Sequence, residues 1–362
     1  MTRIALVLGH DACAGYRDGG AVGLIMRELR DATPPGQDAR IFGPPAAVAP
    51  LAGPGFTPVV PSWWDRLRRP KAAYRSALIR ALRRFGPAII EVHNQRVLPE
   101  RLKRALPAAR IVSVLHSPVG FDLAERTAWL SAVDAAVCVS DFIRTALVDG
   151  VPRHLAERAR TIYNPLPAVP PAPDAARERM ILFAGRIIPE KGPDAFVAAA
   201  AMLRDRLPGW RFLLIGSEGA DPTAEERRFA DRVRREATAA GVEVMGLIPN
   251  RDLLAIVARA TLVVMPSRFP DPLGRVAQEA VASGAALVAA RRGGIPEAAG
   301  DAAIYVDPDQ PDEIAAAVTR VASDDAHRAG MIARGRHHAQ RFAIGKIMQE
   351  WTDFRSGLIA PT

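Results

Sequence analysis

The chain has 362 residues, 49% hydrophobic and 24% charged, which is the composition of a globular protein long enough for two domains. Its formal net charge of +9 favours anionic partners, which include polyanions, anionic membrane surfaces and phosphorylated small molecules. No apolar run reaches the roughly 18 residues of a membrane helix. The two cysteines, Cys13 and Cys138, lack metal-ligand spacing, so neither a disulfide scaffold nor a zinc scaffold is expected. A reducing cytoplasm fits best.

The first half alternates short β-rich runs with amphipathic helical segments. "MTRIALVLGH" is too short for a secretory signal and lacks a cleavage site, so it is expected to be the first strand. The segments "AVGLIMRELR", "AIIEVH", "RIVSVLH" and "AAVCVS" continue the pattern. This alternation is typical of βαβ units and predicts a parallel sheet. Residues 1–166 are therefore expected to form a Rossmann-like domain.

Basic residues concentrate in one segment of this half, Trp63 to Phe85, which contains eight Arg or Lys side chains and a single acid, Asp65. Its paired tryptophans, its arginines and its apolar residues Leu78, Ile79, Leu82 and Phe85 resemble an interfacial helix with its entry loop. Such a segment would adsorb to an anionic membrane. The alternative is a solvated helix whose apolar stripe packs on the sheet.

A Pro-rich stretch within "NPLPAVPPAPDAARER" then interrupts the pattern, and we expect residues 167–178 to be a semi-rigid linker. The alternation resumes and predicts a second doubly wound Rossmann-like domain over residues 179–340. Residues 341–362 contain the amphipathic segment "RFAIGKIMQEWTDFRSGL", expected to be a helix that packs back on the first domain. Because such sheets bind ligands at the carboxyl ends of their strands, two facing sheets should share one site in the cleft between them.

The first candidate binding residues follow the strand "ILFAG". Gly185 and Arg186 come directly after it in "GRIIPEKG", and Lys191 precedes a helix expected to begin near Pro193. Both cations can therefore point into the expected cleft. An arginine fork and a lysine point charge suit a diphosphate. The alternative is a surface turn with solvated charges.

Further along, "TLVVMPSRFPDPLGRV" predicts a second strand, loop and helix. The helix should begin near Gly274, where free backbone amides and the helix dipole attract anions. Asp271 lies before the helix, and Glu279 lies roughly 7.5 Å along its axis, so the two acids straddle the anion site. A nucleotide sugar has this layout, because its diphosphate lies between a sugar and a ribose whose hydroxyls each seek a carboxylate.

In order and spacing these motifs resemble retaining GT-B glycosyltransferases of family GT4, in which a GR…KG turn precedes an E-x7-E motif. The resemblance covers nearly the whole chain. It implies that Arg186 and Lys191 hold the donor diphosphate. It also implies that Glu279 binds the ribose and that Asp271 contacts the transferred sugar. The turn "RRGGIPE", ending at Glu297, resembles the family's following Gly-Gly turn. Backbone amides that would hold sugar and phosphate belong to Leu273, Gly274, Arg275 and Val276.

The resemblance implies transfer of a sugar, with retention, from a UDP- or GDP-type sugar to a glycan or lipid-linked acceptor. "EVHN" resembles members that build bacterial surface polysaccharide or lipopolysaccharide. In this family the acceptor is thought to attack from the face that the diphosphate leaves, without an enzymic nucleophile, a metal or a cofactor. The chain departs at Asp271, where the family usually has Glu, one C–C bond or about 1.5 Å longer. We expect transfer with an altered sugar contact; the alternative is a non-transferring relative.

The first half contributes further candidates. Gly19 and Gly20 open a helix after the first strand, where the family's glycine-rich loop approaches the donor; the alternative is a plain N-cap turn. His93, Asn94 and His116 follow two strands and are candidates for the acceptor side. His116 is our choice for a polar contact near the reacting sugar, and a structural histidine is the alternative.

Other classes of protein fit less well. "GHDACAGYRDGG" is a poor match to the GxGxxG of a nucleotide-cofactor oxidoreductase, and no P-loop occurs. "DPD", Asp307 to Asp309, imitates a metal-binding motif but precedes a helix as entry residues would. A nucleotide-sugar epimerase of the same fold is the catalytic alternative. A nucleic-acid or membrane-binding module would rest on the basic segment alone, and no nucleic acid is expected.

Overall fold

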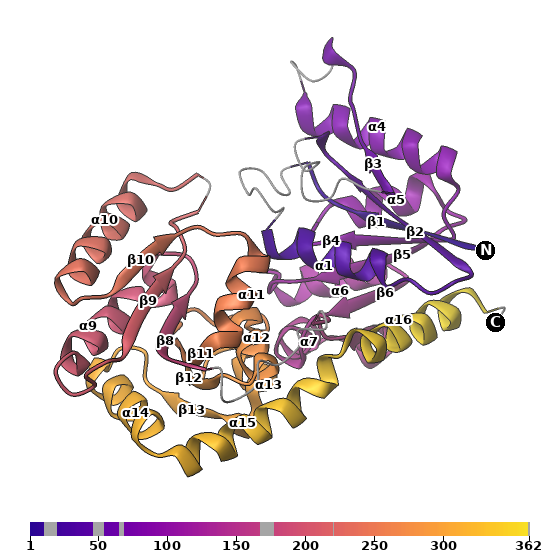
Figure 1. The fold of residues 1–362 in the computed structure, drawn as a ribbon. Helices are drawn as coiled ribbons and strands as arrows, with labels where there is room; N and C mark the ends of the chain where they lie inside the picture. Colours follow the sequence, from indigo (N-terminus) through magenta and orange to yellow (C-terminus); the bar gives the residue numbers. More distant parts are fainter. Residues whose placement is uncertain (11–19, 46–53, 65–68, 167–176, 220, 361–362) are drawn as a thin grey trace. The chain divides into compact units, whose positions relative to one another are not determined.

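The structure, a computed structural model, describes residues 1–10, 20–45, 54–64, 69–166, 177–219 and 221–360. The chain forms two compact units (Figure 1). Unit 1 comprises Met1–Pro167 and Ile344–Thr362, and unit 2 comprises Ala168–Ala343. Most of the linker predicted at residues 167–178 lies outside the described residues. No helix in the described ranges is long and apolar enough to cross a membrane.

Unit 1 is built on a seven-stranded parallel sheet with the order β3-β2-β1-β4-β5-β6-β7. The order reverses beside β1, as in doubly wound folds. The strands are β1 (Thr2–Val7), β2 (Gln37–Gly43), β3 (Phe56–Pro58), β4 (Ile89–His93), β5 (Arg110–Leu115), β6 (Ala135–Cys138) and β7 (Ala159–Thr161). The helices are α1 (Gly20–Asp31), α4 (Pro70–Phe85), α5 (Leu98–Ala105), α6 (Leu123–Ser131), α7 (Asp141–Val148), α8 (Arg153–Ala156) and α16 (Ile344–Ile359).

The sheet of unit 1 has a hydrophobic core on each face. Along β1, Ile4 and Leu6 contribute to one core and Ala5 and Val7 to the other, because successive side chains point to opposite faces. Helices α1 and α16 cover the first face, and α4 and α5 cover the second. The C-terminal helix α16 therefore belongs to the packing of unit 1, to which it contributes the buried Trp351.

Helix α4 corrects part of the interfacial prediction for the basic segment. Leu78, Leu82 and Phe85 are buried in the core under the sheet, and Ile79 packs against that core half-buried. These side chains therefore cannot enter a membrane while the unit is folded. Arg80, Arg83 and Arg84 remain on the exposed side of the helix. Trp63 and Trp64 are also exposed, at 62% and 60%, with their rings stacked 3.8 Å apart.

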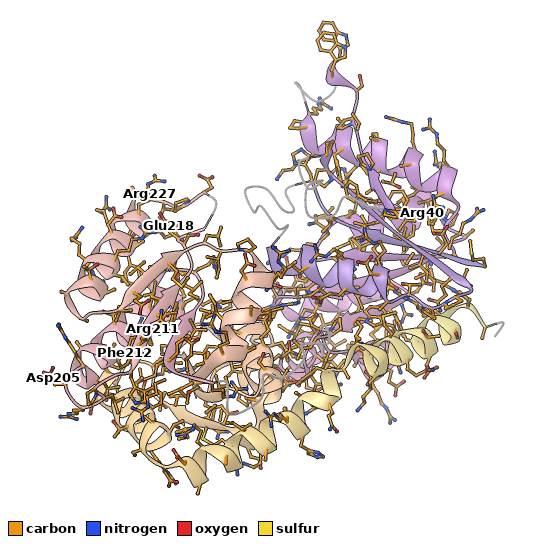
Figure 2. All side chains as sticks on the ribbon, viewed as in Figure 1. Arg40, Asp205, Arg211, Phe212, Glu218 and Arg227 are labelled. Carbon is orange, nitrogen blue, oxygen red and sulfur yellow. The ribbon has the colours of Figure 1, made fainter. Side chains whose placement is uncertain are left out.

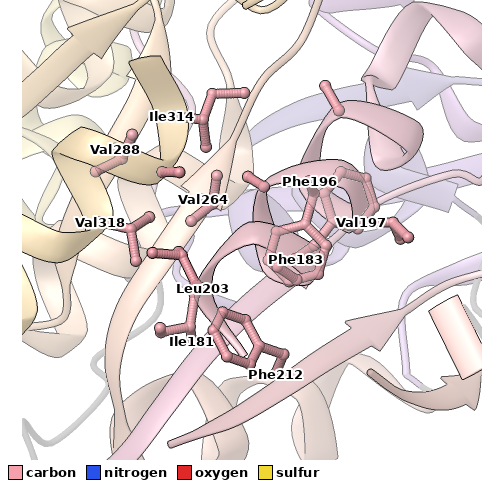
Figure 3. Close-up of a cluster of buried hydrophobic side chains, with 14 of the residues drawn as sticks. Ile181, Phe183, Phe196, Val197, Leu203, Phe212, Val264, Val288, Ile314 and Val318 are labelled. Carbon is pink, nitrogen blue, oxygen red and sulfur yellow. The ribbon is translucent and has the colours of Figure 1, made fainter. Parts of the chain in front are cut away.

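Unit 2 contains a six-stranded parallel sheet with the order β10-β9-β8-β11-β12-β13, which reverses beside β8. Figure 3 shows its main core, where side chains such as Phe183, Phe196 and Val264 meet. The strands are β8 (Glu178–Ala184), β9 (Arg211–Ile215), β10 (Glu243–Gly246), β11 (Ala260–Met265), β12 (Ala286–Ala290) and β13 (Ala303–Val306). The helices are α9 (Pro193–Leu203), α10 (Ala224–Ala239), α11 (Asn250–Arg259), α12 (Arg275–Ser283), α13 (Ile295–Ala299), α14 (Pro311–Ser323) and α15 (Asp325–Ala339). Both units thus confirm the predicted doubly wound α/β class.

Candidate functional site

The loop from β8 to α9 carries the first predicted cations. Gly185 follows the strand directly, and the exposed Arg186 makes no hydrogen bond or ion pair with any residue that the structure describes. Its charge reaches the neighbouring helix α10, where it helps to lower the pKa of Glu226 after the larger effect of the Thr223 hydrogen bonds. Arg186 is therefore a cation at the carboxyl edge of the sheet that can meet an anion there without giving up an ion pair.

Gly192 brings this loop against the one that follows β11. Its φ is +69°, and a Cβ at this position would lie 2.0 Å from the Pro266 carbonyl oxygen. Only glycine fits both the left-handed conformation and this close approach. The Glu190 carbonyl then accepts hydrogen bonds from the Arg268 and Phe269 amides, each 2.9 Å long. The two loops, far apart in sequence, are thereby joined into one surface.

Lys191 and Asp271 meet across this junction. The ammonium of Lys191 forms an ion pair with Asp271 Oδ1 and lies 5.5 Å from the centroid of the Phe269 ring. Asp271 is only 6% exposed, and its Oδ2 atom is buried without a hydrogen-bond partner in the described residues. A buried carboxylate oxygen without a donor is costly, so this atom is poised to accept a hydrogen bond from a bound hydroxyl.

Arg268 links the same two loops to a third loop, and the sequence analysis did not predict this role. Its guanidinium donates to both Asp194 carboxylate oxygens, at 2.8 and 3.1 Å, and to Asp309 Oδ1 at 2.5 Å. A further bond of 2.8 Å reaches the Pro189 carbonyl. Asp309 of the "DPD" sequence is thus the partner of an arginine. No group of three side chains suited to a metal occurs in the parts of the chain that the structure describes.

Helix α12 opens at this surface, as its sequence predicted. Gly274 is its N-cap, with φ +84° and no side-chain cap, so the first-turn amides, including those of Arg275 and Val276, lie at an uncapped helix start. Leu273 is buried beside them. The Gly-Gly turn packs closely against the loop that precedes the helix, since a Cβ on Gly293 would lie 2.3 Å from the Asp271 carbonyl oxygen. Such amides attract anions.

Glu279 lies in α12, 2% exposed, where Arg275 Nε donates to its Oε1 at 2.8 Å. The (i, i+4) spacing was visible in the sequence and could have predicted this pair. A buried carboxylate that accepts from a guanidinium is fixed in place. The ribose role of Glu279 stays a prediction, and Arg275 gains a role for its side chain besides the one predicted for its amide.

In unit 1, His93 and His116 come together at the carboxyl ends of the neighbouring strands β4 and β5. His93 Nδ1 and His116 Nε2 are 2.9 Å apart, and both rings are buried. The outer nitrogens, His93 Nε2 and His116 Nδ1, have no partner among the described residues. Asn94, at φ +51°, accepts from the His116 amide at 2.8 Å and so fixes the position of the second histidine.

Both histidines are neutral near pH 7. Burial is the main cause that lowers the pKa of His93 well below 6.5, followed by the charges of His116 and Arg355. Burial alone lowers the pKa of His116 to about 4. In the neutral pair one ring donates to the other, so the two outer nitrogens are one N–H donor and one acceptor. The sequence placed both histidines at strand ends but did not predict their contact.

The remaining predicted residues are placed as follows. Gly20 is the first residue of α1, with φ +65°. Gly19 lies outside the described residues. The expectation that the two sheets share one site concerns the placement of the units and stays a prediction.

Solved structures with this fold define its class. The chain superimposes on a sucrose-phosphate synthase from Thermosynechococcus elongatus with a TM-score of 0.79 and 22% identity, over all of both chains. HepE from Anabaena, in complex with UDP-glucose, gives a TM-score of 0.76 and 18% identity over 99% of this chain and 100% of that one. Identities this low establish the fold alone, which is GT-B with two parallel-sheet α/β domains.

Family models identify the family. Residues 171–338 match the model described as Glycosyl transferases group 1, and residues 19–168 match that of Glycosyltransferase Family 4. The chain belongs to these glycosyltransferases.

Among curated proteins it is similar to D-inositol 3-phosphate glycosyltransferases. The protein from Corynebacterium aurimucosum is 32% identical over 170 residues, which are 46% of this chain and 40% of that protein. The protein from Corynebacterium glutamicum is 34% identical over 191 residues, 50% and 44% respectively. The matches span less than half of these relatives.

Proposed function

We propose that this protein transfers a sugar from a nucleoside-diphosphate sugar to an acceptor hydroxyl, and that unit 2 binds the donor. The observation that carries the proposal is the buried Asp271 Oδ2, which has no partner among the described residues and lies beside the ion pair with Lys191. A sugar hydroxyl would satisfy it. The membership of a glycosyltransferase family supports the reaction class, and the bound UDP-glucose of HepE supports a donor of this type.

The diphosphate would lie between Arg186, Lys191 and the first amides of α12. An ammonium has three donor protons, so Lys191 can pair with Asp271 and still donate to a phosphate. Arg186 adds a fork of parallel donors. Glu279, held in place by Arg275, would accept from the ribose diol. These groups would stabilise the charge that develops on the diphosphate as it leaves.

We propose that transfer retains the configuration of the sugar and needs no metal. The acceptor oxygen would bond to the anomeric carbon on the face from which the diphosphate departs. The leaving phosphate oxygen would take the bonding electron pair and receive the acceptor's proton. Unit 1 would supply the acceptor side, with His116 as a polar contact and His93 and Asn94 positioning it. An unchanged rate after treatment with a chelator would support the metal-free reaction.

For the acceptor we propose a glycan or lipid-linked hydroxyl, as in surface-polysaccharide or lipopolysaccharide synthesis. The named substrate of the curated relatives makes an inositol phosphate the alternative acceptor, although the first of these relatives matches only 46% of this chain.

A nucleotide-sugar epimerase is the alternative reaction. Supplying a UDP- or GDP-sugar without an acceptor separates the two reactions, because an epimerase forms the epimer and a transferase does not.

The donor assignment is tested by separating nucleotide binding from transfer. We expect UDP or GDP to raise the melting temperature of the protein. Asp271→Ala should lose transfer much more than nucleotide binding, because it faces the sugar. Glu279→Gln should weaken binding of the free nucleoside diphosphate. Asp205→Ala removes an exposed carboxylate elsewhere on unit 2 and should change neither property. Equal loss of transfer and nucleotide binding in Asp271→Ala would place this residue on the nucleotide and contradict its sugar role.

We also propose that unit 1 adsorbs to anionic membranes, where a lipid-linked acceptor would be found. Two exposed features favour this: the stacked pair Trp63 and Trp64, and the basic face of α4 with Arg80, Arg83 and Arg84. Tryptophan favours the membrane–water interface, and arginine is attracted to anionic headgroups. The protein would then be cytoplasmic and peripheral on the inner face of the membrane.

A further inference from the structure

A basic hollow of about 720 Å³ lies in unit 2, apart from the donor residues. Residues from the start of β8, from the segment between α9 and β9, and from α15 line it. Its charged lining consists of five arginines and one acid: Arg177, Arg179, Arg206, Arg328, Arg336 and Asp325. Such a volume is typical of small-molecule sites. An excess of four positive charges around one hollow favours the binding of an anion.

The hollow lies at the opposite edge of the sheet from the donor residues. Arg179 is near the start of β8, whereas Arg186 follows its end, and a strand of seven residues spans roughly 23 Å at about 3.3 Å per residue. Figure 2 shows the same separation along β9, with Asp205 and Arg211 at one end of the strand and Glu218 near the other. One small ligand cannot occupy both places, so the hollow is a separate site.

The base of the hollow is held rigidly by backbone carbonyls. Arg177 Nη1 donates to the Ala260 carbonyl at 2.7 Å and its Nη2 donates to the Ser283 carbonyl. A Cβ placed on Gly284 would lie 2.7 Å from Arg177 Nη2 and 3.0 Å from Arg336 Nε, so these two guanidinium groups converge on one point. The base of the hollow thus holds two positive charges close together, which favours an anion at this place.

Two arginines at the rim have no evident structural role. Arg179 and Arg206 are exposed and form no hydrogen bond or ion pair with the residues that the structure describes. Glu178, the acid next to Arg179, is instead held by Arg211 and Arg259. Several other arginines of this unit pair with acids, such as Arg211 with Glu243 at 2.8 Å. The side chains at the rim are therefore available to a ligand.

We propose that this hollow binds a small soluble anion that carries at least two phosphoryl groups. A phosphate monoester carries about −1.5 to −2 charges near neutral pH, so two or three such groups match the charge of the lining. Guanidinium forks bind phosphate oxygens in pairs. The half-buried Trp210 adds an apolar wall, which packs against the core and can report on binding through its fluorescence. The concave lining favours a small ligand over a macromolecule.

The test uses inorganic tripolyphosphate as the probe. The full chain carries Lys191→Ala and Glu279→Gln to weaken the donor residues, and calorimetry measures binding. We expect one site per chain, weakened about tenfold or more by Arg179→Gln with Arg206→Gln, in proportion to two lost charge-assisted contacts. Tripolyphosphate should also change the fluorescence of Trp210, and this change should disappear in Trp210→Phe. Citrate in place of tripolyphosphate tests a carboxylate source; tighter binding of citrate would contradict the phosphoryl assignment.

The matched control is Arg228→Gln with Arg235→Gln, which removes two exposed arginines from α10 without touching the hollow. This control should bind tripolyphosphate as the parent does. Equal weakening in both double variants would mean that net charge alone attracts the probe and would overturn the proposal. The absence of binding to the parent would also overturn it. Neither result would bear on the donor residues, which the separate measurements of nucleotide binding and transfer test.

Discussion

Glu91 in β4 and Arg355 in α16 form a bidentate ion pair, although 264 residues separate them in sequence. The bonds are 2.8 and 3.0 Å long, and the two residues are 0% and 1% exposed. Removing one partner leaves a buried charge, so Arg355→Leu should lower the free energy of unfolding by about 3 to 5 kcal/mol. Denaturant unfolding followed by circular dichroism measures the change.

A double variant distinguishes the coupling between the two charges from the cost of leaving one charge buried without its partner. Glu91→Leu combined with Arg355→Leu should cost much less than either single change, because hydrophobic replacement of a whole buried pair is often nearly neutral. If the two single costs simply add in the double variant, the pair contributes no coupling and this interpretation is wrong.

The histidine pair predicts how stability depends on pH. Unfolded histidine binds a proton near pH 6.5, whereas burial keeps His93 and His116 neutral to lower pH, to about 4 for His116. Between these values the unfolded chain binds more protons. The free energy of unfolding should therefore fall as the pH drops from 6.5 toward 4, by up to about 1.4 kcal/mol per pH unit for each histidine. Urea unfolding across this range measures the slope.

The contribution of the pair is isolated by substitution. His116→Gln should flatten the slope, whereas His154→Gln, which removes an exposed histidine from α8, should leave it unchanged. Identical slopes in the wild type and in His116→Gln would show that His116 titrates normally.

Gly192 should tolerate no side chain. Gly192→Ala places a Cβ 2.0 Å from the Pro266 carbonyl and should lower the free energy of unfolding by roughly 3 kcal/mol or more. Gly209→Ala is the control, because Gly209 has a similar φ of +79° with nothing near its Cβ position, and it should cost only about 1 kcal/mol. Equal costs would show that backbone conformation alone explains the requirement for glycine.

Membrane adsorption should depend on the basic face of α4. At low salt we expect the protein to sediment with anionic liposomes, because each basic residue near the surface contributes about 1 kcal/mol. Changing Arg80, Arg83 and Arg84 to Ser should abolish sedimentation without unfolding the protein, since these side chains are exposed. Raising the salt should weaken adsorption in the wild type. Failure of the wild type to sediment would exclude this proposal.

The alternation of apolar runs was sufficient to predict both sheets, because strands covered by helices on both faces are continuously hydrophobic. The side of α4 that becomes buried could not be predicted, since a stripe such as Leu78 and Leu82 suits a core and a membrane equally. Contacts that depend on tertiary packing could not be predicted from the sequence either. The partners of Arg268 lie in loops far along the chain, and nothing in "SRFPD" indicates which acids it meets.

The guanidinium of Arg268 has a consequence for how this surface can vary between homologues. It ties Asp194 and Asp309 to the loop that presents Asp271, so loss of the arginine leaves two carboxylates without their cation, and loss of either carboxylate releases one of the loops. Substitutions at these positions should therefore arise together, or be lost together, in related sequences. Adaptation to a new sugar would then proceed more readily through residues outside this linked set.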